Sequence, residues 1–244
     1  MTPDELRIIS LQKDFLDFDK NLAYLKDIIA KNNHKKRLIV APEVYLGGFD
    51  YDAMSMMAKK SAKAIEELIL LINDAIVVFS AIVEKEGKFY NQALVINQHR
   101  IVYRQEKTKL FKLGNEHKHF DSGSEESIAL FEVEGIRFAI LLCFELRFKT
   151  LWEKIEGADV VCIPAKWGVL RAHHLEILAK ALAVMNQCFV VVSSCGDESI
   201  AQASMIFSPD GDVYRDTEDA YVTKEIDIKE ATKMRRYIDM GEQG

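Results

Sequence analysis

The sequence of 244 residues is poor in residues that interrupt regular structure, and none of its hydrophobic runs reaches membrane-spanning length. It holds four prolines and twelve glycines, and no Ser/Gly-rich linker divides it. We therefore expect a single domain over residues 1–228, followed by a tail of residues 229–244 on the surface or between subunits. The longest apolar runs, such as residues 139–144, fall far short of the roughly 20 residues of a spanning helix.

Basic residues are outnumbered by acidic ones, and cysteines are few. With 32 basic and 38 acidic residues the net charge is −6, which excludes the polybasic class of nucleic-acid-binding proteins. The four cysteines lie in or beside apolar runs, so they are predicted to be free thiols in a reducing compartment. Residues 1–15 carry acidic side chains where a signal peptide needs a basic and then an apolar segment. We expect a cytoplasmic protein.

Apolar residues recur with two alternating periods. Three- and four-residue spacings predict helices over residues 15–29, 57–72, 146–157 and 173–187. Runs rich in β-branched residues predict strands over residues 37–43, 75–83, 88–97, 100–104, 127–135, 136–144, 158–165 and 188–194, with a last hairpin over 203–215. The segment 105–127 has no period and is predicted to be a long loop. Strands that alternate with helices and are apolar on both faces indicate an α/β protein with covered, mixed sheets.

Three polar residues stand beside these apolar segments. Cys143 follows a strand and precedes a helical stretch, where the N–H groups of a helix N-terminus favour a lowered pKa of its thiol. Glu43 follows another strand, and Lys107 lies in the aperiodic loop. Taken singly, each residue type at such a place is more often structural or solvated than catalytic. Only their combination indicates catalysis.

The segments around these three residues occur in a characteristic order. APEVYLGGF surrounds Glu43, YRQEKTKLF surrounds Lys107, and LLCFELRF surrounds Cys143. They resemble the three signature blocks of the nitrilase superfamily, the carbon–nitrogen hydrolases. Further matching blocks are FYNQALVIN, GNEHKHFDSG, GADVVCIPAKW, HHLEILAKALAVMNQ and SPDG. The resemblance runs from about residue 8 to about residue 228 and implies a four-layer αββα sandwich, in which two mixed β-sheets face each other with helices outside.

The resemblance also implies a Glu–Lys–Cys triad. By position, Cys143 is the nucleophile, Glu43 the general base, and Lys107 the cation that holds the oxyanion together with the backbone N–H of Phe144. Glu116 matches the glutamate that commonly orients the lysine. The local chemistry agrees, because a thiol needs a base and a tetrahedral intermediate needs donors already in place. The implied reaction is amide hydrolysis through a thioester, with release of ammonia and a carboxylic acid, and it requires no cofactor.

Four residues outside the triad depart from the family pattern, among them Ala203, which replaces a frequent glycine before Ser204. Lys109 stands where the family commonly has a histidine. Leu182 and Met185, in the predicted helix 173–187, replace an arginine and a glutamate. These two changes remove a common ion pair and are expected to leave an apolar surface. Since the family assembles through helices that flank the nucleophile, we expect a homodimer or a larger homo-oligomer.

Two other classes of function are alternatives. A nitrilase-like protein without catalysis, acting in binding or regulation, is expected to have lost a triad residue, and none is lost here. A papain-type hydrolase would need a histidine base from the set His117, His119, His173 and His174. No metal is expected, because His173 and His174 are spaced too irregularly from Cys188 and Cys195 for a recognised zinc site.

Several classes of amide substrate are compatible with the sequence. The stretch PAKWGVLRAHH resembles the bacterial ω-amidase group, which hydrolyses 2-oxoglutaramate-type compounds. A general aliphatic amidase, an N-carbamoyl amine hydrolase and a deaminated-glutathione amidase are alternatives. We predict that Arg147, Lys166 and Trp167 bind the substrate, with the cations on a carboxylate remote from the scissile amide. The competing interpretation is that Arg147 pairs with a structural carboxylate such as Glu145 or Glu153.

Overall fold

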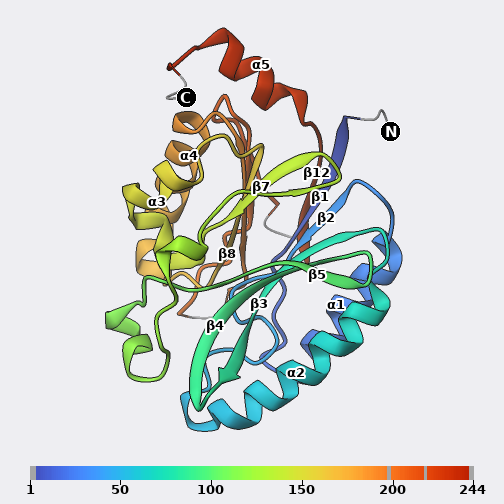
Figure 1. Cartoon of the computed structure of the whole chain (residues 1–244), viewed down its shortest axis with the longest axis vertical. Helices are drawn as coiled ribbons and strands as arrows, with labels where there is room; N and C mark the ends of the chain where they lie inside the picture. Colours follow the sequence, from blue (N-terminus) through green and yellow to red (C-terminus); the bar gives the residue numbers. More distant parts are fainter. Residues whose placement is uncertain (1–3, 197–198, 217–218, 242–244) are drawn as a thin grey trace.

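The computed structural model describes residues 4–196, 199–216 and 219–241, and its framework is two six-stranded mixed β-sheets (Figure 1). The first sheet has the order β12-β1-β2-β3-β4-β5, and its strands are β1 (Glu5–Leu11), β2 (Arg37–Val40), β3 (Ile76–Lys85), β4 (Lys88–Asn97), β5 (Arg100–Glu106) and β12 (Tyr221–Asp227). The second has the order β11-β10-β9-β8-β7-β6, and its strands are β6 (Phe131–Val133), β7 (Ile136–Ile140), β8 (Val160–Ala165), β9 (Phe189–Ser194), β10 (Met205–Phe207) and β11 (Val213–Tyr214).

Each sheet has three neighbouring parallel strands with antiparallel strands beside them. The parallel strands are β1, β2 and β3 in the first sheet, and β7, β8 and β9 in the second. Parallel strands need a crossover connection, which is usually a helix. The alternation of strands and helices in the sequence follows from that requirement.

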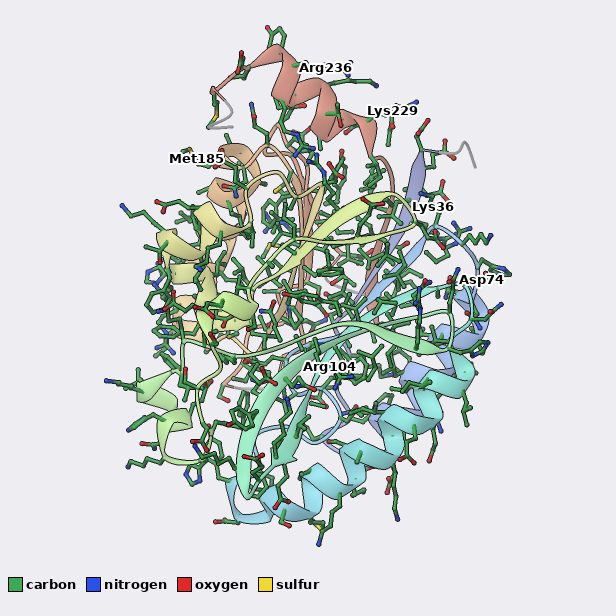
Figure 2. All side chains as sticks on the ribbon, viewed as in Figure 1. Lys36, Asp74, Arg104, Met185, Lys229 and Arg236 are labelled. Atoms are coloured by element: carbon green, nitrogen blue, oxygen red, sulfur yellow. The ribbon has the colours of Figure 1, made fainter. Side chains whose placement is uncertain are left out.

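The inner faces of the two sheets share one apolar core. In β2, Leu38 and Val40 join a cluster with Phe138 and Ile140 of β7, whereas Ile39 faces the opposite side and packs in a cluster with residues of the covering helices. This is the two-residue period of a strand that is buried on both faces. Side chains fill the space between the sheets (Figure 2).

Helices form the two outer layers. The cluster outside the first sheet contains residues of α1 (Phe18–Asn32) and α2 (Met54–Leu71). The cluster outside the second contains residues of α3 (Lys149–Lys154) and α4 (Ala172–Met185). The predicted αββα sandwich is therefore confirmed, and the layers can be followed in Figure 1.

The structure differs from the predicted elements in several places. The first helix begins at Phe18 because the Asp17 side chain caps it by accepting from the Lys20 N–H at 2.9 Å. The predicted helix 146–157 is two elements, a 3₁₀ helix called η5 (Cys143–Arg147) and then α3. Strands β1 and β12 were not predicted as strands. They pair antiparallel along their whole length.

The expectation that Leu182 contributes to an apolar surface is wrong. Leu182 is fully buried, because it lies on the face of α4 that packs on the second sheet. Met185, at the end of the same helix, is 56% exposed, and Figure 2 labels it there.

The segment after residue 228 begins with a helix, α5 (Lys229–Tyr237). Arg235 of α5 forms an ion pair with Asp159 and donates to the Ala158 carbonyl at 2.9 Å. The Gln187 side chain donates to the Ile238 carbonyl at 2.7 Å. Residues 242–244 lie outside the described part of the chain. Among the described residues, no helix combines the length and the hydrophobicity needed to cross a bilayer.

Candidate active site

Glu43, Lys107 and Cys143 each come shortly after the end of a strand, namely β2, β5 and β7. All three residues are buried, with exposed fractions of 1%, 0% and 7%. The Lys107 ammonium donates to Glu43 Oε1 at 2.7 Å, and both charges act on the Cys143 thiol. The structure thus brings the three predicted residues together, with the glutamate and the lysine from the first sheet and the cysteine from the second.

Lys107 lies between two carboxylates. Its Nζ also donates to Glu116 Oε1 at 2.9 Å, which places the predicted orienting glutamate beside the lysine. Burial alone would lower the pKa of Lys107, but the two carboxylates outweigh it and raise that pKa above its ordinary value. The lysine is therefore held as an ammonium ion. Burial raises the pKa of Glu116, and this exceeds the opposing effect of Lys107.

Backbone hydrogen bonds hold the lysine in an otherwise aperiodic loop. The Lys107 N–H donates to the Asn91 carbonyl at 2.8 Å, and the Lys107 carbonyl accepts from the Gly123 N–H at 2.9 Å. A Cβ on Gly123 would come within 2.6 Å of the Glu106 carbonyl oxygen, so only glycine fits this approach. Glu116 secures the loop again, because its Oε2 accepts from the Phe111 N–H at 2.9 Å.

Glu145 connects the loop 105–127, called the lysine loop, to the turn that begins at Cys143. Its Oε1 accepts from the Thr108 N–H at 2.7 Å and from the Thr108 hydroxyl at 2.9 Å. Its Oε2 accepts from the Leu142 N–H at 2.7 Å. This carboxylate is fully buried and fixes the residue after Lys107 relative to the residue before Cys143. The sequence analysis named it only as a possible partner of Arg147, a pairing that the structure does not contain.

Cys143 occupies a constrained position at the start of η5. Its φ angle is +48°, in the left-handed region that residues other than glycine seldom adopt. The expectation of a lowered thiol pKa is wrong. Burial and then the negative charge of Glu43 raise the pKa of Cys143 well above its ordinary value, although Lys107 and the Lys166 backbone N–H oppose this. The thiol is protonated at neutral pH and needs a base.

Cys143 opens into a small pocket with an empty volume of about 310 Å³, its open mouth included. The pocket walls carry aromatic and cationic side chains. They are Phe111, Phe144, Arg147, Lys166, Trp167 and Arg171, and Glu116 also lines the pocket. All the predicted substrate-binding residues therefore reach the same space as the thiol. Arg171 was not predicted, because nothing in the local sequence distinguishes it from a surface arginine.

Arg147 pairs with neither Glu145 nor Glu153. Its Nη2 donates to His174 Nδ1 at 3.0 Å, which requires that nitrogen to be unprotonated. The guanidinium lies 4.8 Å from the centre of the Trp167 ring. No ion pair between Arg147 and a carboxylate occurs within the described ranges. Its charge is therefore available to an anionic ligand.

Lys166 differs from Arg147 because it already has an acidic partner. Its Nζ lies 3.1 Å from Asp14 Oδ2, and both side chains are largely buried. Burial alone would raise the pKa of Asp14, but Lys166 and the Asn21 side chain lower it below its usual value. Asp14 was not predicted as part of the site, since it lies far from Lys166 in sequence. The pair fixes Lys166 at the pocket wall.

The four histidines considered as alternative bases do not line the pocket, although His174 contacts Arg147 at its wall. His117 and His119 belong to the lysine loop, and His173 and His174 to α4. None of the four lines the pocket that contains Cys143. Across the described residues, no group of three or more His, Cys, Asp or Glu side chains is placed to hold a metal ion.

Comparisons with known proteins point to one family of enzymes. Residues 6–236 match the model of a family described as carbon–nitrogen hydrolase. A 2-oxoglutaramate amidase of Bacillus subtilis is 28% identical over 232 residues, which cover 90% of this chain and 89% of that protein. A deaminated glutathione amidase of Escherichia coli is 28% identical over 205 residues, covering 81% and 74%. The crystal structure of a CN-hydrolase superfamily protein from Xanthomonas campestris has a TM-score of 0.82 at 22% identity, covering 96% and 95%.

The ion network predicts an unusual pH dependence of stability. Lys107→Met should lower the free energy of unfolding by about 3–5 kcal/mol near neutral pH, because two buried carboxylates lose their cation. The loss should shrink as the pH falls, since burial already raises the pKa of Glu116 and protonation removes its charge. Urea unfolding at about pH 8 and about pH 5 measures the effect.

Lys109→Met is the matched control. Lys109 lies on the same loop and pairs with Glu125 at the surface. Its replacement should therefore lower the free energy of unfolding only slightly, and by a similar amount at both pH values. A loss for Lys107→Met that is equally small, or that grows on acidification, would contradict the buried-charge interpretation.

Proposed function

The chain belongs to the carbon–nitrogen hydrolase family, and we infer from this membership and from the site that it hydrolyses the terminal amide of a small carboxylic acid. The observation that carries the inference is the buried Lys107, held between Glu43 and Glu116 beside Cys143. An ω-amidase that acts on 2-oxoglutaramate-type compounds fits best, and the similarity to the 2-oxoglutaramate amidase of Bacillus subtilis supports it.

The first half of the reaction forms a thioester. Glu43 takes the proton of the Cys143 thiol, and the sulfur attacks the amide carbonyl carbon. The carbonyl oxygen becomes an oxyanion that the Lys107 ammonium and the Phe144 N–H stabilise, because both donors are in place before the charge develops. Glu43 then passes its proton to the nitrogen, the C–N bond breaks, and ammonia leaves.

The second half of the reaction returns the enzyme to its starting state. Glu43 removes a proton from a water molecule, whose oxygen attacks the thioester carbon. The same donors hold the second oxyanion. When the C–S bond breaks, the sulfur recovers its proton from Glu43 and the carboxylic acid leaves. A base is needed in each half because the pKa of Cys143 is raised and water is a weak nucleophile.

Variants of the triad test this mechanism. Cys143→Ala should abolish ammonia release and the acyl-enzyme mass, because no nucleophile is left. Glu43→Gln should lower kcat by about 10²- to 10⁴-fold, the usual contribution of a general base. Lys109→Ala should keep most of the activity. If Lys109→Ala were as damaging as Lys107→Ala, the assignment of the lysine within YRQEKTKLF would be wrong.

Arg147 is the best candidate for binding a substrate carboxylate. It lines the pocket, stacks on Trp167 and lacks a carboxylate partner within the described ranges. A guanidinium can hold a carboxylate by two parallel hydrogen bonds. Lys166 contributes less in this proposal, because Asp14 already neutralises it. Such a contact fixes the substrate carbonyl over the thiol, so it affects kcat as well as binding.

A substrate pair tests the role of Arg147. Wild-type protein should prefer an ω-amide with a free carboxylate over its uncharged methyl ester. Arg147→Ala should reduce that preference by about 10- to 100-fold, the size of a lost hydrogen bond to a charged group. Arg215→Ala, which removes an exposed arginine paired with Glu176, is the control. Equal rates on acid and ester in the wild type would favour a general aliphatic amidase.

Assembly into a homodimer is part of this proposal. Ile177 and Val184 lie seven residues apart in α4 and are 61% and 44% exposed, and Leu170, in the turn just before this helix, is 84% exposed. Residues seven apart lie on one helix face. Met185 extends the apolar surface beside them. A second copy of the chain would cover this face. We also place the protein in the cytoplasm, which its four free, buried cysteines support.

The molecular mass in solution tests the dimer. Light scattering at micromolar concentration should give at least twice the monomer mass of 27.8 kDa. Ile177→Glu should yield monomers, because it places a charge in the buried apolar contact. Leu70→Glu is the control, since Leu70 is similarly exposed but lies on α2, in the other outer layer. A wild-type protein that is strictly monomeric would contradict the proposal.

A further inference from the structure

Asn91 contacts two of the proposed triad residues in different ways. It lies in β4 and is 1% exposed. Its side-chain Nδ2 donates to Glu43 Oε1 at 2.8 Å, and its backbone carbonyl accepts from the Lys107 N–H at 2.8 Å. A single residue of the first sheet therefore fixes the orientation of the carboxylate and the position of the lysine backbone.

The two oxygens of the Glu43 carboxylate are in different environments. Oε1 accepts from both Asn91 Nδ2 and Lys107 Nζ. Oε2 is buried and has no hydrogen-bond partner within the described residues. An ionised carboxylate only accepts hydrogen bonds, so the amide must present its NH₂ group to Glu43. Asn91 Oδ1 is consequently turned elsewhere and also has no partner among the described residues.

We propose that Asn91 is a positioning residue that, together with Lys107, occupies Oε1 and reserves Oε2 of Glu43 as the oxygen that carries the proton. The inference rests on the proposed function, in which Glu43 is the base. As the S–H bond of Cys143 breaks and the S–C bond forms, the proton moves to Oε2. It leaves Oε2 for the nitrogen as the C–N bond breaks, and the proton of the hydrolytic water later takes the same place.

The groups that surround Glu43 explain why one amide matters. The charged and titratable neighbours are Lys107, Glu116, Cys143 and Tyr51. The ammonium of Lys107 contacts both Glu43 and Glu116, so its positive charge does not compensate the negative charge of Glu43 fully. The Asn91 amide is the second hydrogen-bond donor to the Glu43 carboxylate. Without it, the ionised form of Glu43 is less stable relative to the protonated form. The orientation of the carboxylate then depends on its contact with Lys107 alone.

The test removes the amide donor of Asn91 in two ways. Asn91→Asp is isosteric but offers no N–H donor when ionised, and Asn91→Ala removes the side chain. Both should lower kcat/KM by about 10- to 100-fold, the size of a lost hydrogen bond to a charged group. In both, the acidic limb of the kcat/KM profile should move to higher pH, because a higher pH is needed to ionise the base. A packing defect alone would not move that limb.

Gln92→Ala is the matched control. Gln92 is the next residue of β4, on its opposite face, and makes the same kind of bond, donating to Glu106 Oε1 at 2.7 Å. It should keep the wild-type pH profile. The pH dependence of Cys143 alkylation by iodoacetamide gives a second readout, which remains measurable if turnover by the Asn91 variants is too slow to follow.

The outcomes separate this inference from the proposed function. If both Asn91 variants keep the wild-type pH profile in turnover and in alkylation, Asn91 only packs and the inference is overturned. If Glu43→Gln is as active as wild type, the proposed base is wrong, whatever the Asn91 variants do. If Glu43→Gln is inactive and the acidic limb moves to higher pH in the Asn91 variants, the results support both Glu43 as the base and Asn91 as its positioning residue.

Discussion

The burial of one positive charge is the constraint on which the site depends. An ammonium ion without water must be matched by anions at hydrogen-bond distance, and Lys107 is matched by Glu43 and Glu116. Glu43 follows β2 and Glu116 lies in the loop 105–127 itself, so Lys107 contacts both carboxylates only when this loop is folded against the end of β2. The need to compensate the charge of Lys107 thus holds the loop 105–127 in one conformation, although the loop has no regular structure of its own.

The same charges decide how the cysteine can react. Burial and the negative charges of Glu43 and Glu116 raise the pKa of the Cys143 thiol, and together they outweigh the opposing effects of Lys107 and the Lys166 N–H. A resting thiolate is therefore unfavourable, unlike in cysteine enzymes where a neighbouring cation holds the sulfur ionised. In the proposed reaction, the thiol becomes reactive only when a substrate carbonyl is present and the proton leaves as the S–C bond forms. A neutral resting thiol is also a poor target for oxidants.

Much of the fold follows from local patterns, because strands buried on both faces and amphipathic helices leave periodic signals in the sequence. β1 and β12 carry charged residues among short apolar runs, and they become strands only because they pair with each other and because β1 also pairs with β2. The three residues of the proposed triad could be predicted because they lie within recognisable segments. Asp14 and Arg171 could not, since their roles depend on distant partners, and the pKa of Cys143 was misjudged because local sequence does not report burial.

The pairing of β1 with β12 has a consequence for the order of events during synthesis. Hydrogen bonds such as that from the Thr223 hydroxyl to the Ile8 carbonyl join residues 215 positions apart. At roughly 5–20 residues per second, a nascent chain carries β1 for ten seconds or more before its outer neighbour emerges. Until then that edge of the first sheet offers unpaired N–H and C=O groups to any other chain. Prematurely terminated chains keep this edge open permanently, which makes them substrates for chaperones and proteases.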